Sequence, residues 1–329
     1  MGITTLRDVA REAGVSVATA SNALNNPSVV RPETRKLVLE VAAKLAYIPN
    51  VNGQRLRARE SRTIGLFVRA MTGEYYCALA DQMFRACQEQ GYEVHICMVV
   101  DTRSILKKLG DRTLDGAVIF CDDLEADAVE RMEAYGIPLL FLGLEREGER
   151  TSCILYESET HGRMAADYLL GLGKKRLLHI FGLPGNLDSE KRWIGFREEL
   201  RNRGMKNAKI PVLYGLFERA SAYREMRKYL LEGHQPPDAI FAANDLSAIG
   251  CMAALSEMGY RVPEDVSVLG CDDITLCEYI TPALTTIRTN FWDTGTLAAD
   301  EVIRLIRGEE GRTIRQSGNL VIRKSCKLS

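Results

Sequence analysis

The sequence predicts a small all-α headpiece with a helix-turn-helix, followed by an α/β core of two doubly wound parallel-sheet lobes. Two observations support this division. Residues 4–24 form two short apolar-faced helical patterns that Gly14 separates, whereas from Thr63 onward short apolar runs alternate with amphipathic segments. A length of 329 residues suits one small domain plus one large or two medium domains.

The first helix has clear start and stop signals. Thr5 can act as its N-cap, and Asp8, three positions later, is a short relative of the Glu or Gln that closes a capping box. Gly14 follows the last periodic residue, where a left-handed C-cap conformation favours a residue without Cβ. One face of the helix is apolar because four side chains recur at helical spacing, namely Leu6, Val9, Ala10 and Ala13.

Two further helices complete the headpiece. Ser16 caps the second helix, in which small residues at 18, 20 and 23 allow close approach to the first. Arg31-Pro32-Glu33-Thr34 signals the third, with proline in the first turn and Glu33 near the positive end of the helix dipole. The second helix of such a motif can lie in the major groove of DNA. The alternative is an ordinary helical hairpin in a larger core.

The remainder of the chain predicts two sets of about four or five parallel strands. Near-continuous Ile, Val and Leu runs between helices are typical of strands that are covered on both faces. Helices are expected around 76–90, 102–109 and 125–135. The expected strands are 63–70, 92–100, 116–121 and 138–143 in the first set, and 176–182, 210–215, 238–244 and 266–272 in the second.

Composition and charge narrow the class of protein. The net charge is −1, but residues 1–62 hold ten Lys or Arg against five Asp or Glu, so a basic N-terminal module precedes an acidic body. This asymmetry is typical of localised phosphate contact, although a solvated surface has the same composition. Nine cysteines without metal-ligand spacing predict reduced thiols and no metal. No signal peptide and no membrane-spanning apolar run is present, so we expect a cytoplasmic protein without a membrane partner.

Several segments resemble one family along nearly the whole chain. TLRDVAREAGVS, TASNALN, VRPETRKLV and LAYIPN are similar to the headpiece of the lactose-repressor/galactose-repressor (LacI/GalR) family, and GYRVPEDVSVLGCDD and TPALTTIR are similar to its core. The resemblance implies a homodimeric transcriptional repressor whose affinity for double-stranded operator DNA is controlled by a small-molecule effector. It also implies the fold of periplasmic sugar-binding proteins, with the effector between the two lobes.

The resemblance also implies domain boundaries. The headpiece covers residues 1–49 and a basic hinge covers residues 50–61, which in the family becomes helical on the operator. The core covers residues 62–329. Within the core, the N-lobe takes about 62–160 and 290–320, and the C-lobe about 161–289 and 321–329. We expect dimers rather than tetramers, because no leucine heptads follow the core.

Family positions imply a set of DNA contacts. Val17 and Ala18 would offer apolar contact, best matched to a thymine methyl, and Asn22 could bond an adenine edge. Leu56 occupies the position of the leucine that enters the minor groove, although a flexible Arg-rich tether has the same composition. The remaining expected contacts, mostly to phosphates and in the hinge, are Leu6, Arg7, Ser16, Thr19, Ser21, Asn25, Thr34, Tyr47, Asn50 and Gly53.

Residues at predicted strand ends suggest an effector site. Ligands of doubly wound sheets bind beyond the carboxyl ends of the strands. A guanidinium, an amide and a carboxylate together with aromatic rings suit a polyhydroxylated ligand, so a sugar or sugar derivative is expected. The alternative for an Asn or Asp after a strand is that it only caps the next helix. The expected effector contacts are Tyr75, Tyr76, Arg192, Phe217, Asn244 and Asp272, of which Arg192, Asn244 and Asp272 match family effector positions.

Departures from the family pattern limit the identity of the effector. Gly143 stands where sugar-responsive members often carry Asp, and Thr289 where the lactose repressor has Gln. Residues 186–189 lack the Arg of purine-responsive members, which argues against a purine as the effector.

Two alternative functions remain. One is a catabolite-type regulator with a phosphoprotein corepressor, and the other is a solute-binding protein. The four histidines have no Ser or Cys partner in a nucleophile motif, and no cofactor motif is complete, so we expect neither catalytic residues nor a cofactor.

Overall fold

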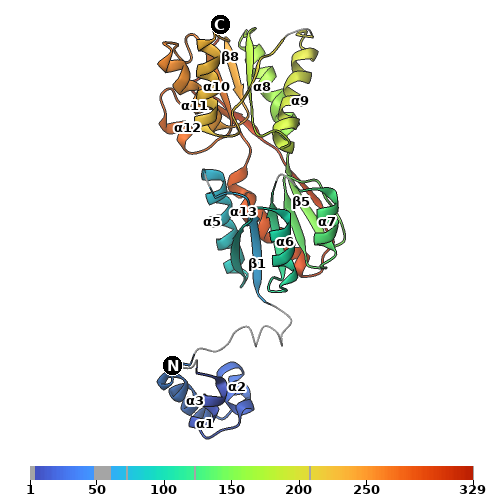
Figure 1. Ribbon diagram of the computed structural model, residues 1–329, viewed down its shortest axis with the longest axis vertical. Coiled ribbons are helices and arrows are strands. Elements are labelled where there is room, and N and C mark those ends of the chain that lie inside the picture. Colours follow the sequence, from blue (N-terminus) through green and yellow to red (C-terminus); the bar gives the residue numbers. More distant parts are fainter. Residues whose placement is uncertain (1–3, 48–60, 72, 122–123, 207–208, 329) are drawn as a thin grey trace. The chain divides into compact units, whose positions relative to one another are not determined.

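The computed structural model describes residues 4–47, 61–71, 73–121, 124–206 and 209–328. The chain divides into two compact units, residues Met1–Ser61 and Arg62–Ser329, and each is described by itself below. Figure 1 shows that the first unit is helical and that the second contains two sheets with helices around them.

The first unit is the expected helix-turn-helix headpiece. It contains α1 (Leu6–Glu12), α2 (Val17–Asn25), the short 3₁₀ turn η1 (Pro27–Val29) and α3 (Pro32–Lys44). Small apolar side chains from all three α-helices form one buried cluster, which allows the helices to pack closely: Val9, Ala10, Ala13, Ala20, Ala23, Val38, Val41 and Ala42.

Local hydrogen bonds set both ends of α1. The Asp8 carboxylate accepts hydrogen bonds from the Thr5 backbone N–H at 3.0 Å and the Thr5 hydroxyl at 2.7 Å, as the capping pattern predicts. At the other end, Gly14 has φ +66°. Its N–H donates to the Arg11 carbonyl at 3.3 Å, and the Val15 N–H donates to the Ala10 carbonyl at 3.0 Å. These two bonds form a Schellman motif, which turns the chain from α1 toward α2.

The first lobe of the second unit contains a six-stranded sheet in the order β11-β5-β4-β3-β1-β2, with all its pairs parallel. Helices α5 and α13 pack on one face, and α6 and α7 pack on the other. The strands are β1 (Thr63–Val68), β2 (Glu93–Met98), β3 (Gly116–Phe120), β4 (Leu139–Leu142), β5 (Thr151–Tyr156) and β11 (Thr313–Gln316). The helices are α5 (Glu74–Glu89), α6 (Thr102–Gly110), α7 (Ala126–Glu133) and α13 (Thr294–Ile306).

The second lobe has the same design, with strand order β12-β10-β9-β8-β6-β7 and only the β10–β12 pair antiparallel. Helices α8 and α9 cover one face, and α10 and α11 cover the other. Its strands are β6 (Leu177–Phe181), β7 (Val212–Tyr214), β8 (Ala239–Ala242), β9 (Ser267–Asp272), β10 (Thr285–Arg288) and β12 (Asn319–Val321). Its helices are α8 (Ser158–Gly171), α9 (Leu187–Asn202), α10 (Arg219–Leu231), α11 (Asp245–Glu257) and α12 (Leu276–Tyr279).

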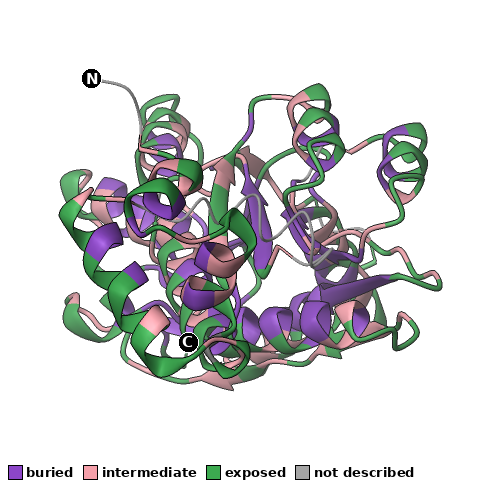
Figure 2. Ribbon diagram, turned by 90° about the horizontal axis from the view of Figure 1, so that it is seen from below, coloured by how far each residue is buried: buried purple, intermediate pink, exposed green. Residues whose placement is uncertain are grey.

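The chain passes between the lobes after β5, after β10 through the 3₁₀ turn η2 (Phe291–Asp293), and after β11. Each sheet has six strands rather than the expected four or five. The expected ranges missed β5 and β10, which begin with two polar residues each, and β11 and β12, which are short and only partly buried. None of the four has the long apolar run of a central strand. Buried residues concentrate on the central strands and on the sides of the helices that face them (Figure 2).

Helices α8 and α9 approach each other closely through two glycines. A Cβ atom on Gly162 would lie 1.9 Å from the backbone oxygen of Arg192, and a Cβ on Gly195 would lie 1.9 Å from that of Glu159. Neither contact is possible without movement of a backbone. This packing therefore determines the position of α9, which carries Arg192.

Candidate DNA-binding and effector-binding sites

One face of helix α2 is turned toward solvent, and it carries both polar and apolar side chains. Ala20 and Ala23 face the headpiece core, whereas Val17 is 44% exposed, and Ala18 and Asn25 are also exposed. Ser21 and Asn22 are half-buried. Helical periodicity places residues 17, 18, 21, 22 and 25 on the same side. The predicted base-reading residues therefore share a surface that the headpiece core does not use.

The N-terminus of α2 is closed by two of the predicted phosphate contacts. Ser16 Oγ accepts a hydrogen bond from the Thr19 backbone N–H at 3.0 Å, and the two hydroxyl oxygens lie 2.8 Å apart. A helix N-terminus attracts anions, because its first N–H groups have no helical partners. Arg7 on α1 is exposed.

Some of the other predicted DNA contacts also pack against the headpiece core. Leu6 and Tyr47 are half-buried and pack against the headpiece core, so only part of each side chain faces solvent. Thr34 is also half-buried. Three further predicted contacts, Asn50, Gly53 and Leu56, lie outside the described residues.

Arg192 is the buried cation of the predicted effector site. It lies in α9, is 4% exposed, and donates from Nη1 to the carbonyl oxygen of Ala243. Burial acts to lower the pKa of its guanidinium, but the neighbouring Cys271, Asp272 and Asp188 raise it above the usual value. Among the described residues, its Nε has no hydrogen-bond partner. A buried, charged donor is thus available to a ligand.

Two carboxylates act on this guanidinium. Burial raises the pKa of Asp272 well above its usual range; Arg192 opposes this shift, and the charges of Asp245 and Asp188 add to it. Asp272 ends β9 with φ +122°, and Asp273 follows with φ +64°. Residues other than glycine rarely adopt a positive φ, because it strains the backbone. Residues with this strain are concentrated at functional sites.

Asp188 is the acidic residue that sequence reasoning did not single out. It lies in the first turn of α9 and accepts a hydrogen bond from Ser158 Oγ at 2.6 Å. A Cβ atom on Gly143, in the first lobe, would lie 4.0 Å from Asp188 Oδ2. Asp188 therefore brings a carboxylate close to the position where sugar-responsive members of the family often carry Asp. One feature of the sequence could have indicated Asp188 as a candidate effector contact. It lies three residues after Gly185, where the chain turns from a strand into a helix.

An aromatic ring and an amide are held beside these charges. Phe217 has φ +60°, and its ring lies over Gly182, where a Cβ atom would be only 2.3 Å from the ring. Asn244 caps α11, because its Oδ1 accepts from the Ser247 N–H at 3.0 Å. Its Nδ2 also donates to the Phe217 carbonyl oxygen at 3.0 Å. Asn244 therefore caps the helix that follows its strand, which was the alternative to an effector contact. The same side chain also positions Phe217.

Tyrosines from the first lobe extend the site. Tyr75, in the first turn of α5, packs against the cores of both lobes. Its hydroxyl lies 2.8 Å from that of Tyr156, which in turn lies 2.8 Å from Thr294 Oγ1. The Tyr76 ring packs on Phe120 with centroids 5.4 Å apart. The Tyr75 hydroxyl is thus already bonded, which leaves its ring as the part that could contact a ligand.

Polar contacts also join the two lobes. The Thr275 N–H donates to Glu74 Oε2 at 2.9 Å, and Lys191 Nζ lies 3.7 Å from Glu145 Oε2. Thr289, at one lobe crossing, is 1% exposed, and its hydroxyl has no hydrogen-bond partner among the described residues. In the part of the chain that the structure describes, no group of His, Cys, Asp and Glu could hold a metal ion.

Comparisons with known proteins agree with this geometry. Residues 5–50 match the model for bacterial regulatory proteins of the lacI family, and residues 166–326 match that for a periplasmic binding protein-like domain. The HTH-type transcriptional repressor PurR of Pasteurella multocida (strain Pm70) is 31% identical over 98% of both chains. A Lac repressor dimer bound to operator and the anti-inducer ONPF superposes with a TM-score of 0.84 at 27% identity, covering 99% of this chain and 100% of that one. The regulator CelR, in complex with cellobiose, gives 0.73 at 28% identity, covering 98% and 99%.

The chain belongs to the LacI family. It is a DNA-binding transcriptional repressor under the control of a ligand, and the predicted fold is confirmed. The prediction of a regulator rather than an enzyme is also confirmed, because these relatives are transcriptional repressors. No helix within the described residues is long and apolar enough to cross a membrane.

Proposed function

We propose that this repressor reads its operator with the exposed face of α2 and responds to a neutral sugar bound by Arg192, Asp272 and Asp188. The observation that carries the proposal is the buried guanidinium of Arg192. Its Nε has no hydrogen-bond partner among the described residues, and it interacts electrostatically with Asp272 and Asp188. Forked donors and carboxylates match neighbouring hydroxyl groups, and the Phe217 ring supplies an apolar face. The cellobiose complex of a regulator that is 28% identical supports a sugar.

The charges of the site favour an uncharged ligand. Arg192 contributes one positive charge, whereas Asp188 and Asp272 are both acidic, and burial already disfavours the charged form of Asp272. A phosphate or carboxylate on the ligand would add negative charge beside these two acidic side chains in a low-dielectric environment, and would disfavour the charged form of Asp272 further. A neutral sugar adds hydroxyl donors without adding charge, so it fits better than a sugar phosphate.

A competition assay tests this effector class. Purified repressor on a selected operator fragment is titrated with neutral mono- and disaccharides including cellobiose, with sugar phosphates, and with hypoxanthine and guanine. The purines are included because purine-responsive members occur in the family. We expect a change in operator affinity with one or more neutral sugars only. A change produced by a purine or a sugar phosphate alone would contradict the proposal.

The DNA-reading role predicts a change of specificity. Replacing Val17 and Ala18 with polar residues should alter the preferred operator, because each base contact contributes roughly 1–3 kcal/mol of discrimination. Both side chains are exposed, so the headpiece should still fold. Selection from randomised DNA compares the variant with the parent. Recovery of the same site by both proteins would remove these residues from the base-reading surface.

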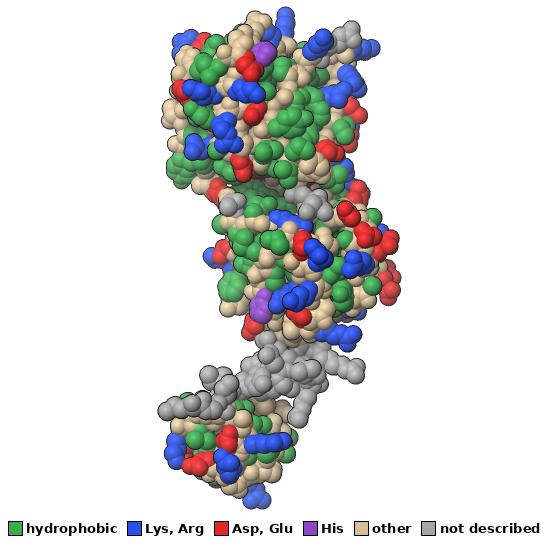
Figure 3. Space-filling model, in the orientation of Figure 1, with side chains coloured by type: hydrophobic (Ala, Val, Ile, Leu, Met, Phe, Trp, Pro, Cys, Tyr) green, Lys and Arg blue, Asp and Glu red, His purple; other side chains and the backbone are tan. Residues whose placement is uncertain are grey.

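We also propose a homodimer. Large apolar side chains remain exposed on the edge strand β2 and on α5, including Ile96 at 47%, Met98 at 64% and Phe84 at 48%. Groups of apolar side chains also lie on the visible face of each lobe in Figure 3. Exposed apolar surface of this kind marks protein contacts. The similar Lac repressor is a dimer on its operator, which supports the same assembly here.

A further inference from the structure

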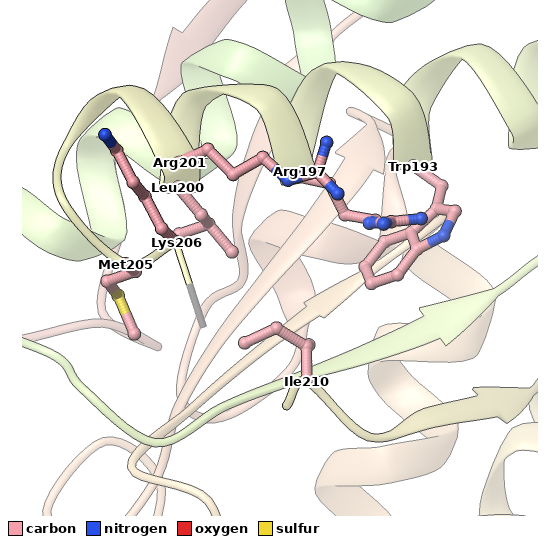
Figure 4. A pocket seen from close by; sticks show the side chains of 7 residues that line it. All are labelled: Trp193, Arg197, Leu200, Arg201, Met205, Lys206 and Ile210. Atoms are coloured by element: carbon pink, nitrogen blue, oxygen red, sulfur yellow. The ribbon is translucent and has the colours of Figure 1, made fainter. Parts of the chain in front are cut away.

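The second lobe carries a groove that is lined by none of the proposed effector-site residues. Its volume is about 310 Å³, which is within the range of small-molecule sites. Figure 4 shows side chains from α9 and from the segment that follows it around this groove. The lining residues are Trp193, Arg197, Leu200, Arg201, Met205, Lys206 and Ile210.

The groove combines an apolar wall with unbalanced positive charge. Trp193, Leu200, Met205 and Ile210 supply the wall, and no carboxylate is among the lining residues. The two acidic residues of the same helix that lie nearest in sequence to Arg197 and Arg201 make other contacts: Glu198 lies 2.9 Å from Arg163, and Glu199 lies 3.0 Å from Arg203. The three cations of the groove, Arg197, Arg201 and Lys206, form no ion pair within the described residues.

The indole of Trp193 is held rigidly at one end of this groove. Its ring stacks on the buried His179 with centroids 4.9 Å apart and planes 14° apart. The guanidinium carbon of Arg197 lies 5.4 Å from the centroid of the same indole. An apolar group could therefore rest against Leu200, Met205 and Ile210 beside this fixed indole, while an anionic group meets the cations.

We propose that this groove is a second ligand site, for an organic phosphate monoester with an apolar or aromatic body. A phosphate monoester carries close to two negative charges at neutral pH and offers three acceptor oxygens. Arginine forks bind phosphate oxygens in pairs, and lysine adds a compact charge. In a body with more acidic than basic residues, three cations that form no ion pair among the described residues complement such a ligand around an apolar groove.

The chain provides its own reporter for a test. It has two tryptophans, Trp193 and Trp292, so Trp292→Phe leaves the groove residue as the only indole. The full-length variant is titrated with adenosine 5′-monophosphate, adenosine and inorganic phosphate while Trp193 fluorescence is recorded. We expect saturable binding of the nucleotide, and binding of adenosine and of inorganic phosphate that is each about tenfold weaker or more, because each lacks half of the recognised groups.

Variants separate the groove from general charge effects. Arg201→Gln with Lys206→Gln should weaken nucleotide binding by about tenfold or more, because two charge-assisted contacts are lost. Lys107→Gln with Arg131→Gln removes the same charge from exposed sites on the other lobe and should leave binding unchanged. Asp272→Asn should also leave it unchanged. The proposal is overturned by equal loss in both double variants, by loss in Asp272→Asn, by equal binding of adenosine or inorganic phosphate, or by no saturable signal.

Discussion

Asp272→Asn is expected to weaken binding of the effector sugar by about 2–5 kcal/mol, or roughly 30- to 5,000-fold, because it removes one partner of a buried polar contact. Asparagine tolerates positive φ as aspartate does, so the unusual backbone at this position can be kept. The loss therefore reports on the carboxylate rather than on refolding of the loop. Calorimetry with the sugar that the competition assay identifies measures this loss.

A matched substitution provides the control. Asp265→Asn makes the same chemical change at an exposed aspartate that pairs with Arg261 at 3.0 Å. It should leave effector affinity unchanged, since exposed ion pairs contribute little and this one is not among the effector-site residues. Both variants should keep operator affinity in the absence of sugar. Undiminished sugar binding by Asp272→Asn would place the effector elsewhere.

Gly162→Ala is expected to destabilise the second unit by about 3 kcal/mol or more. The added methyl group would meet backbone atoms of the neighbouring helix, so a change of side-chain rotamer cannot relieve the clash. The new Cβ would lie 1.9 Å from the Arg192 backbone oxygen and 2.6 Å from the Phe196 backbone nitrogen. Helix α9 must therefore move, and Arg192 moves with it. Urea unfolding followed by circular dichroism measures the free energy, and calorimetry should show weaker sugar binding in the same variant.

The same helix contains its own control. Gly171 ends α8, and a Cβ atom there would have no heavy atom within 4 Å. Gly171→Ala should be neutral or stabilising by up to about 1 kcal/mol, since alanine favours helix more than glycine does. Equal destabilisation by both substitutions would mean that close packing at Gly162 does not explain the effect.

The headpiece was predictable from the sequence because short-range interactions determine it. The Thr5–Asp8 cap, the left-handed Gly14 and the Pro32 start of α3 each involve residues a few positions apart. The exposed phase of Val17 and Ala18 follows from helical periodicity alone. The alternation of apolar runs and helices in the core likewise predicts parallel sheets, and the family resemblance predicts Arg192 and Asp272 as effector contacts.

The features that the sequence left undetermined depend on contacts between distant segments. Strands β11 and β12 are short, and only pairing with β5 and β10 places them in different sheets. Asp188 becomes a candidate ligand residue because folding brings it close to Gly143, and Phe217 because its ring lies over Gly182. The cationic groove exists because Glu198 and Glu199 bond to Arg163 and Arg203, which leaves Arg201 and Lys206 beside an apolar wall. Local sequence determined the elements and their exposed faces, whereas only tertiary packing decided which charges meet, because those partners are joined through space and not along the chain.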